Sequence, residues 1–347
     1  MAMTENNFRR VWNPPNPYQT EERELLGEPP SAELEVYEDD SNSILSHNDS
    51  PDIGFRWSVN PYRGCFHACA YCYARPTHEY LGLGAGTDFE RKIFVKPKAP
   101  LLLEQAFRRK SWQGELVVFS GVTDCYQPLE ASWRLTRGCL EKCLIFRNPA
   151  FVITKSALVR RDAPLLSNLA KEADAGVSLS IPFLDDETAR VIEPGAPLIT
   201  KRFETMRILA DAGVPVGIGV APVIPGLNDN DIPGLLKEAK RCGARFAFKT
   251  LLRLPGSVKE VFFQRIRTEL PDRAQRLEHR IRESRNGKLY DGRFGERHKG
   301  HGEYWDAVNK LWDLWTERLG FNEEDRLDRD RPSTFRRPDP HGQMQLF

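Results

Sequence analysis

Short apolar runs alternate with longer amphipathic stretches between residues 56 and 251, and this alternation limits the possible folds of the chain. Apolar runs of this length are typical of buried strands, and amphipathic stretches predict helices. Parallel strands need crossover connections, so a strand–helix order predicts a parallel α/β sheet. Six such units fit a partial (β/α)6 TIM-like barrel better than a full eight-fold one. Strands are expected at 56–61, 115–120, 150–154, 177–181, 214–220 and 245–251, with helices near 73–82, 99–110, 130–147, 162–174, 200–212 and 231–242.

The regions on either side of the barrel differ from it in composition. Residues 1–50 contain 3 Lys/Arg and 11 Asp/Glu with little periodicity, which predicts an acidic, largely irregular leader. The barrel is expected over 51–255, and a basic helical extension over 256–320. Residues 321–347 are polar and Pro-rich, which predicts a flexible tail. Within the extension, helices are expected at 258–284 and 302–319.

Overall composition predicts an ordinary globular protein, with 40% hydrophobic and 29% charged residues and a net charge of +1. No apolar run approaches the ~20 residues that a membrane-spanning helix needs. The N-terminus has no basic start followed by an apolar core, the mark of a secretory signal. A cytoplasmic protein with no membrane partner is therefore expected. In that reducing compartment, clustered cysteines are better interpreted as metal ligands than as disulfides.

Three cysteines, Cys65, Cys69 and Cys72, follow the first expected strand in a C-x3-C-x2-C spacing. Thiolates are the usual ligands of iron–sulfur clusters, and three of them can hold three corners of a four-iron, four-sulfur cluster. The fourth iron would stay open to bind a small molecule. The alternative is a zinc site with His67 or His78 as fourth ligand, although two pairs of ligands are more typical of structural zinc. The other cysteines, Cys125, Cys139, Cys143 and Cys242, belong to no matching local motif.

The cysteine loop, with an aromatic residue just before its last cysteine, resembles that of the radical S-adenosylmethionine (SAM) superfamily. More narrowly, residues about 55–255 resemble the spore-photoproduct-lyase-like branch of this superfamily. The stretches that carry this resemblance are 60–65 (NPYRGC), 123–130 (TDCYQPLE), 153–156 (ITKS), 221–226 (APVIPG) and 250–255 (TLLRLP).

The resemblance implies a metal site and a reaction. Cys65, Cys69 and Cys72 would hold a [4Fe-4S] cluster whose open iron binds SAM. An electron from the cluster would cleave SAM to methionine and a 5′-deoxyadenosyl radical, which abstracts a hydrogen atom from the substrate. A reducing partner such as flavodoxin or ferredoxin is implied as well.

The resemblance also implies contacts to SAM at the carboxyl ends of the strands, where this architecture carries its active site. Tyr71 would lie beside the adenine, and Lys155 is suited to the carboxylate of SAM because it carries a positive charge. Ser180 ends another strand, where a plain structural hydrogen bond is an equal alternative. The superfamily often has Gly-Gly-Glu after the second strand, and this pattern is absent here. The residues at that place are Ser120, Gly121 and Thr123, and the resemblance implies that backbone carbonyls there bind the methionyl ammonium of SAM.

Cys125 is a candidate hydrogen-atom donor, because photoproduct lyases use a further cysteine to return hydrogen to the product radical. It does not clearly occupy the family's donor position, and a buried core thiol is the alternative. Cys139, Cys143 and Cys242 are expected to be small buried hydrophobic residues.

Residues 253–300 contain 13 Lys/Arg and 7 Asp/Glu, and their arginines are interleaved with Tyr290 and Phe294. Basic and aromatic side chains together suit phosphates and exposed bases. This pattern indicates DNA as a partner, and a solvated, salt-bridged helix pair is the alternative.

The extreme C-terminus resembles the short peptides by which bacterial repair enzymes dock on the DNA sliding clamp. Its candidate partner-binding residues are Gln343, Leu346 and Phe347. An apolar pair at the end of a polar tail exposes aromatic surface to water unless something covers it. The alternative is a tail that folds back onto its own core.

Together these features predict a lyase-like radical SAM enzyme that repairs damaged DNA. A second hypothesis keeps the radical chemistry and directs it at RNA, a peptide or a small metabolite. A third is a non-catalytic metal-binding scaffold for DNA-repair partners, which has no need of a cofactor pocket.

Overall fold

The computed structural model describes residues 33–322 and 332–338. Its centre is a seven-stranded sheet in the order β10-β9-β8-β7-β6-β3-β2. The two outer strands, β10 and β2, do not pair with each other, so the barrel is open. The parallel strands are β3 (Trp57–Val59), β6 (Val117–Phe119), β7 (Ala150–Thr154), β8 (Ala175–Ser180), β9 (Val216–Val223) and β10 (Phe246–Leu251), and β2 (Leu45–His47) is antiparallel to β3.

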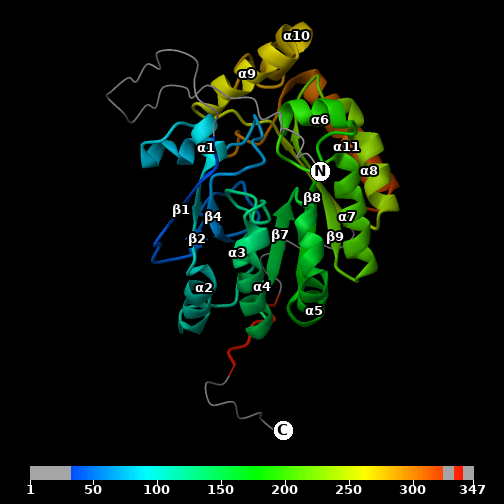
Figure 1. Ribbon diagram of the computed structural model, residues 1–347. Helices are drawn as coiled ribbons and strands as arrows, with labels where there is room; N and C mark the ends of the chain where they lie inside the picture. Colours follow the sequence, from blue (N-terminus) through cyan, green and yellow to red (C-terminus); the bar gives the residue numbers. More distant parts are fainter. Residues whose placement is uncertain (1–32, 323–331, 339–347) are drawn as a thin grey trace, which may run out of the picture.

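These six parallel strands confirm the α/β partial barrel, and each lies within a few residues of its predicted position. Their side chains are mostly buried, because helices cover the parallel sheet. Since the strands are parallel, their carboxyl ends meet at one edge. Figure 1 shows the arrowheads of β7 and β8 pointing toward the end of the molecule where α6, α9 and α10 lie.

Helices follow the strands in the predicted alternation, with two local differences. The stretch expected as one helix at 130–147 is broken at Arg134, whose φ of 53° is left-handed. The stretch at 73–82 forms two 3₁₀ turns, since Pro76 lacks an N–H and Gly82 ends the second turn at a φ of 70°. The helical elements are η1 (Arg75–Thr77), η2 (Glu79–Leu81), α2 (Ala99–Arg108), α3 (Glu130–Trp133), α4 (Leu135–Ile145), η3 (Ala157–Asp162), α5 (Ala163–Ala173), α6 (Asp186–Ile192), α7 (Ile199–Asp211), η4 (Asp229–Asp231) and α8 (Ile232–Arg241).

The described part of the leader is more regular than the sequence predicts. It contains β1 (Glu35–Glu38) and β2, two short strands that the sequence did not predict, and the rest of residues 33–50 is irregular. Strand β1 joins a second sheet in the order β1-β5-β4, with β5 (Lys92–Val95) and β4 (Tyr62–Arg63). All four residues of β1 are exposed, so an alternation of buried and exposed side chains could not reveal this strand. Helix α1 (Thr87–Arg91) leads into β5.

The C-terminal extension is helical, as predicted. Its first helix is divided into α9 (Val258–Glu269) and α10 (Pro271–Glu283), because Pro271 begins a new helix rather than continuing one. Helix α11 (Gly302–Arg318) packs along α8. Among the described residues, no helix is both long and apolar enough to span a membrane.

Residues 332–338 are docked on the barrel, so the expectation of a flexible tail is wrong for this segment. Phe335 lies 6.1 Å from the ring of Phe107 and 6.2 Å from that of Phe146. Arg337 donates hydrogen bonds of 2.8 and 2.7 Å to the carbonyls of Arg109 and Trp112. Figure 1 shows this segment in red at the end of the barrel opposite α9 and α10. One apolar residue in a polar run gave no periodic signal that could have predicted this docking.

Candidate active site at the carboxyl ends of the strands

The three clustered cysteines lie in the loop between β4 and η1. Cys65 and Cys69 are each 7% exposed, and Cys72 is half-buried. Burial raises the pKa of Cys69 well above its usual value, and negative charge on Glu193, Cys65 and Cys72 raises it further. Three thiolates this close repel one another unless cations neutralise them. This donor set therefore fits an iron–sulfur cluster, whose irons would supply that positive charge.

The described residues hold no group of three or more His, Cys, Asp or Glu side chains placed to bind one metal ion. A cluster does not require such convergence, because each thiolate binds a different iron. The two histidines considered as zinc ligands make other contacts. His78 Nε2 lies 2.9 Å from the carbonyl oxygen of Lys92, and His67 Nδ1 lies 3.3 Å from Asp124 Oδ2.

Arg75 binds the backbone of the cysteine loop through hydrogen bonds. Its guanidinium is fully buried and donates hydrogen bonds to the carbonyl oxygens of Ala68 (3.2 Å), Cys69 (2.8 Å) and Ala85 (2.8 Å). A 2.6 Å ion pair with Glu90 balances its charge. The loop carbonyls are therefore satisfied by protein groups, which shapes the loop before any metal binds.

The segment after α6 is hydrogen-bonded to the backbone of the cysteine loop. The amide of Ala70 donates to the carbonyl of Ile192 (2.9 Å), and the amide of Gly195 donates to the carbonyl of His67 (3.0 Å). A Cβ atom at Gly195 would overlap the carbonyl oxygen of Phe66. Only glycine allows this close approach without displacing the loop.

The Gly195→Ala substitution is expected to destabilise the protein by about 1–3 kcal/mol, because the added methyl group must displace backbone. It is also expected to lower the iron bound after reconstitution, since the displaced backbone belongs to the cysteine loop. Thermal unfolding and iron analysis measure the two effects. Gly292→Ala is the control, because a Cβ there meets nothing closer than 3.5 Å. Equal stability and equal iron content of the two variants would contradict the role of Gly195 in supporting the cysteine loop.

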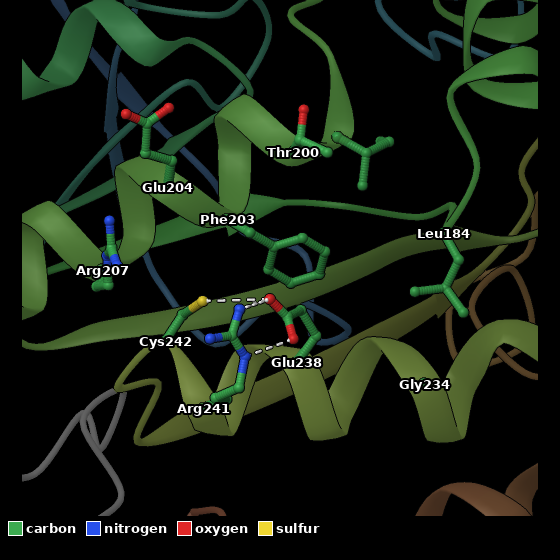
Figure 2. Close-up of a pocket in the computed structure, with 10 residues that line it drawn as sticks. Leu184, Thr200, Phe203, Glu204, Arg207, Gly234, Glu238, Arg241 and Cys242 are labelled. Atoms are coloured by element: carbon green, nitrogen blue, oxygen red, sulfur yellow. Dashed lines mark hydrogen bonds and ion pairs between the residues drawn. The ribbon is translucent and has the colours of Figure 1, made fainter.

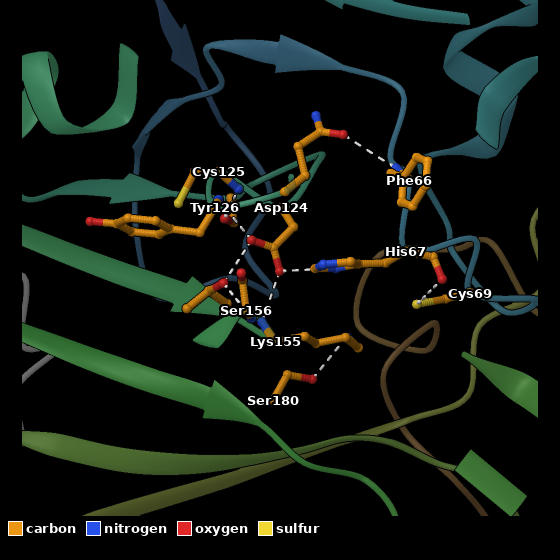
Figure 3. Close-up of polar contacts among 12 residues, drawn as sticks. Phe66, His67, Cys69, Asp124, Cys125, Tyr126, Lys155, Ser156 and Ser180 are labelled. Atoms are coloured by element: carbon orange, nitrogen blue, oxygen red, sulfur yellow. Dashed lines mark hydrogen bonds and ion pairs between the residues drawn. The ribbon is translucent and has the colours of Figure 1, made fainter. Parts of the chain in front are cut away.

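Lys155 directly follows β7 and points across the carboxyl edge of the sheet. Its Nζ donates a 3.0 Å hydrogen bond to Ser180 Oγ and lies 3.8 Å from Glu193 Oε1. The same Nζ lies 5.6 Å from the centre of the Tyr71 ring. Burial alone would lower the pKa of Lys155, but the charges of Glu193 and Cys69 raise it above its usual value. A charged ammonium is thus held beside the cysteine loop (Figure 3).

Glu193 and Arg202 form a fully buried ion pair next to Lys155, with 2.6 Å between Oε2 and Nη1. The Tyr71 hydroxyl donates to Glu193 Oε1, so this ring is anchored in the same network. Arg202 also donates to the carbonyl oxygens of Pro197 (2.9 Å) and Ser180 (3.1 Å). Its Nη2 is buried with no hydrogen-bond partner among the described residues.

Neither Glu193 nor Arg202 was predicted as a site residue. The available signal was weak, because Glu193 follows the end of α6 and Arg202 is a charged residue on α7 whose burial is known only once the inward face of that helix is known. The structure brings them together with the predicted Tyr71, Lys155 and Ser180.

The predicted residues after β6 build the neighbouring loop. Ser120 Oγ accepts a 2.8 Å hydrogen bond from the amide of Cys125, and Thr123 Oγ1 donates one of 2.7 Å to the carbonyl of Tyr62. The carbonyl of Gly121 accepts a 2.6 Å bond from the Tyr73 hydroxyl. These contacts connect the loop to the cysteine loop through Tyr73.

Asp124 joins the end of β7 to the cysteine loop. Its carboxylate accepts hydrogen bonds from Thr154 Oγ1 (2.7 Å) and the amide of Lys155 (2.8 Å), and it faces His67 (Figure 3). Burial would raise the pKa of Asp124, but the charge of His67 and these hydrogen bonds lower it to about 2. Burial would lower the pKa of His67, but the charges of Cys65 and Asp124 raise it to about 9. Asp124 was part of a matching stretch but was not predicted as a site residue.

The Asp124→Asn substitution is expected to destabilise the metal-free protein by about 2 kcal/mol at neutral pH. The carboxyl pKa is lower in the folded protein (about 2) than its ordinary value of 3.8, so its contribution is present above pH 3.8 and lost as the pH falls toward 2. The urea midpoints of wild type and variant should therefore converge as the pH falls from about 4 to about 2. The exposed Asp272→Asn is the control and should match wild type throughout. A difference that does not change with pH would contradict this assignment.

Cys125 is 0% exposed and belongs to the main hydrophobic core. Figure 3 shows it on the side of Asp124 opposite His67 and Cys69. Its role as hydrogen donor stays a prediction. Cys139 and Cys143 are also 0% exposed and Cys242 is 4% exposed, which confirms that they are buried.

A surface groove of about 560 Å³ lies between α7 and α8 (Figure 2). Leu184 and Phe203 line it together with Cys242 and the Glu238–Arg241 ion pair. None of the residues predicted for the active site lines this groove. Gln343, Leu346 and Phe347 lie outside the described residues, so the sliding-clamp peptide also stays a prediction.

The family model described as "Radical SAM superfamily" matches residues 59–239. An uncharacterised protein of Mycobacterium tuberculosis is 37% identical over 212 residues, which cover 60% of this chain and 62% of the relative. An uncharacterised protein of Methanocaldococcus jannaschii is 32% identical over 176 residues, covering 51% of this chain and 63% of the relative. The chain thus spans less than two thirds of the length of either relative.

Two solved structures resemble the whole fold. One is a spore photoproduct lyase mutant with bound AdoMet and dinucleoside spore photoproduct, with a TM-score of 0.59, 18% identity and 86% of both chains covered. The other is spore photoproduct lyase complexed with dinucleoside spore photoproduct, with a TM-score of 0.58, 18% identity and 82% of this chain and 80% of that chain covered. At this level of identity the likeness establishes the shared partial-barrel fold.

Proposed function

The chain belongs to the radical SAM superfamily, whose cofactors are a [4Fe-4S] cluster and SAM, and we propose that it acts on damaged DNA in a photoproduct-lyase-like repair reaction. When bound, these cofactors supply a 5′-deoxyadenosyl radical that abstracts a hydrogen atom from the substrate. The observation that carries the catalytic part of the proposal is the position of the buried, charged Lys155 beside the three-cysteine loop, at one edge of the sheet.

Cys65, Cys69 and Cys72 would hold three irons of the cluster. Burial of these thiols limits their contact with water, and Arg75 and Gly195 fix the loop that carries them. Three ligands leave the fourth iron for SAM. This arrangement supports catalysis over the alternative of a non-catalytic scaffold, which needs neither an open iron nor a charged lysine beside it.

Lys155 would hold the carboxylate of SAM, because its ammonium is charged and already oriented by Ser180 and Glu193. Glu193 and Arg202 would position Lys155 and Tyr71 rather than contact the substrate. Backbone carbonyls of the segment that contains Ser120, Gly121 and Thr123 would accept hydrogen bonds from the methionyl ammonium of SAM. Cys125 remains a candidate hydrogen donor, and flavodoxin or ferredoxin a candidate source of electrons.

DNA as substrate is supported by the basic extension at the same end of the barrel (Figure 1). Part of its charge is internally neutralised: Arg280 pairs with Glu283 (2.6 Å) and Arg282 with Glu278 (2.8 Å). Arg273 and Arg276 on α10 are exposed, however, and have no ion pair with a described residue. RNA, a peptide or a small metabolite is the alternative substrate, and a sliding clamp a further candidate partner.

The first experiment measures the cofactors of the anaerobically purified, reconstituted full chain. Iron and sulfide are quantified, and the electron paramagnetic resonance spectrum of the reduced protein is recorded with and without SAM. Close to four irons and a spectrum that shifts on adding SAM are expected. Zinc in place of iron, or a cluster indifferent to SAM, would contradict the enzyme.

The second experiment tests the substrate. Reduced enzyme and SAM are incubated with ultraviolet-irradiated DNA and with the same DNA not irradiated, and lesion loss is followed by mass spectrometry. Lesion loss that requires SAM is expected. Normal SAM cleavage with unrepaired DNA would refute the DNA-repair proposal and leave the alternatives, which deuterium transfer from labelled RNA, peptide or metabolite into 5′-deoxyadenosine would separate.

A further inference from the structure

Four cationic or basic side chains lie close together next to the cysteine loop. Arg253 follows β10, and Arg285, Arg297 and His298 come from the basic extension. Arg285 is 3% exposed, and the side chain of Arg297 is 15% exposed. Burial and the positive charges of Arg253 and Arg297 lower the pKa of His298 to about 4. Hydrogen bonds from Arg285 Nη2 to the carbonyl oxygens of Leu252 and Arg297 bring the extension beside the end of β10.

Negative charge in this group is scarce. Asp52 acts on His298, and Asp291 acts on Arg285. Both oxygens of Asp52 are already engaged, one by the amide of Gly295 (2.7 Å) and one by Arg297 Nε (2.8 Å). Asp291 is already paired with Arg293 (2.8 Å). Arg253, Arg285 and His298 themselves form no ion pair with a described carboxylate.

Three donor or acceptor atoms in this group lack partners. Arg253 Nε, Arg285 Nε and His298 Nε2 are buried and have no hydrogen-bond partner among the described residues. Buried polar groups are nearly always hydrogen-bonded, so three orphans at one place call for an explanation. An anionic ligand that accepts from these nitrogens would explain all three at once.

The group is preorganised. Arg285 Nη2 donates to the carbonyl of Leu252 (2.7 Å) and to that of Arg297 (3.2 Å). The guanidinium of Arg253 lies 5.4 Å from the centre of the Tyr73 ring. These contacts hold the cations in place without neutralising them, which is what a binding site for an anion requires.

The contact between Arg253 and the Tyr73 ring places these basic side chains beside the candidate active site. Tyr73 directly follows Cys72, its ring is 46% exposed, and its hydroxyl is held by the Gly121 carbonyl. An anion at Arg253 would therefore sit across Tyr73 from the cysteine loop. The exposed ring adds a flat surface on which a base or other planar group can stack.

We propose that Arg253, Arg285 and His298 form a subsite for a phosphate group of the substrate, with Tyr73 between this phosphate and the reacting end. Phosphate suits it because guanidinium groups bind tetrahedral oxyanions through several charge-assisted hydrogen bonds. The phosphate is either a phosphodiester of a nucleic acid or the phosphate ester of a small molecule. The position of the subsite relative to SAM rests on the proposed function. Its ability to bind phosphate rests only on Arg253, Arg285 and His298.

Binding is measured by fluorescence anisotropy of a labelled 12-nucleotide single-stranded DNA with the anaerobic full chain, at several salt concentrations. The variant Arg253→Gln is expected to bind about tenfold more weakly. The slope of log affinity against log salt should fall by about 0.7, the value for one phosphate of a single strand. His298→Gln should weaken binding in the same direction, and it guards against a folding defect in any one variant. Arg109→Gln, which removes an exposed arginine at the end of α2, at the opposite end of the barrel from α9 and α10 (Figure 1), is the control and should change affinity less than about threefold.

A second arm uses inorganic phosphate and follows thermal stabilisation. Phosphate that stabilises wild type but not Arg253→Gln, together with DNA binding that does not depend on Arg253, would support the subsite and assign it to a small phosphate ester. If Arg253→Gln and Arg109→Gln behave alike toward both probes, the subsite is refuted. Neither arm requires SAM cleavage, so failure of the enzyme proposal and failure of the subsite are distinguishable.

Discussion

The Cys69→Ala variant is expected to fold, to bind no stable four-iron cluster and to lose all detectable reductive cleavage of SAM. Cys69 lies between the other two cysteines in the loop, and its thiol interacts with both. Two remaining thiolates cannot hold three corners of a cluster. The fold should persist, because the loop is supported by Arg75 through backbone carbonyls that the substitution leaves in place. Iron and sulfide content, visible absorption and 5′-deoxyadenosine formation measure these effects.

The matched control is Cys242→Ala. Cys242 is a buried cysteine of the same chain, 4% exposed, and it lies in the groove between α7 and α8 rather than in the cysteine loop. Its replacement should leave iron content and SAM cleavage at wild-type levels. Iron loss in both variants would point to a general effect on folding. Full iron content in Cys69→Ala would remove this residue from the cluster.

The Arg202→Met variant is expected to be destabilised by about 3–5 kcal/mol, which is the usual result of breaking a buried ion pair from one side. Glu193 would remain fully buried, with Tyr71 and the more distant Lys155 as its only described partners. Equilibrium unfolding of the metal-free protein in urea, followed by tryptophan fluorescence, measures the loss.

The double variant Glu193→Gln with Arg202→Met tests whether the loss comes from uncompensated charge. Removing both charges should cost less than the sum of the two single substitutions, because neither charge is then left alone. Simple additivity would show that the two groups do not stabilise each other. Arg241→Met, which breaks the exposed pair with Glu238, is the control and should leave the urea midpoint close to that of wild type.

The barrel could be predicted from sequence because its signals are local and repeated. Residues 150–154 are predicted as a strand and form β7, because their apolar run lies between Pro149 and Lys155. The cysteine motif could also be recognised in the sequence, because its three expected ligands lie within eight residues. Lys155 and Ser180 were correctly brought together because the ends of adjacent parallel strands must meet at one edge.

Features that depend on distant partners could not be predicted in this way. Glu193 directly follows α6 and Arg202 lies on α7, and their pairing appears only when these two segments have been packed. Strand β1 is exposed on both faces and is specified by its partner β5 rather than by its own pattern. The left-handed Arg134 that separates α3 from α4 belongs to a residue type that normally continues a helix.

The docking of residues 332–338 has a practical consequence for handling the protein. Phe335 and Arg337 attach this segment at the amino ends of the strands, far from the cysteine loop (Figure 1). An immobilised sample anchored through residues beyond 338 would therefore present its catalytic end outward, away from the support. Long nucleic acids, electron donors and SAM could then reach that end from solution without steric interference from the attachment point.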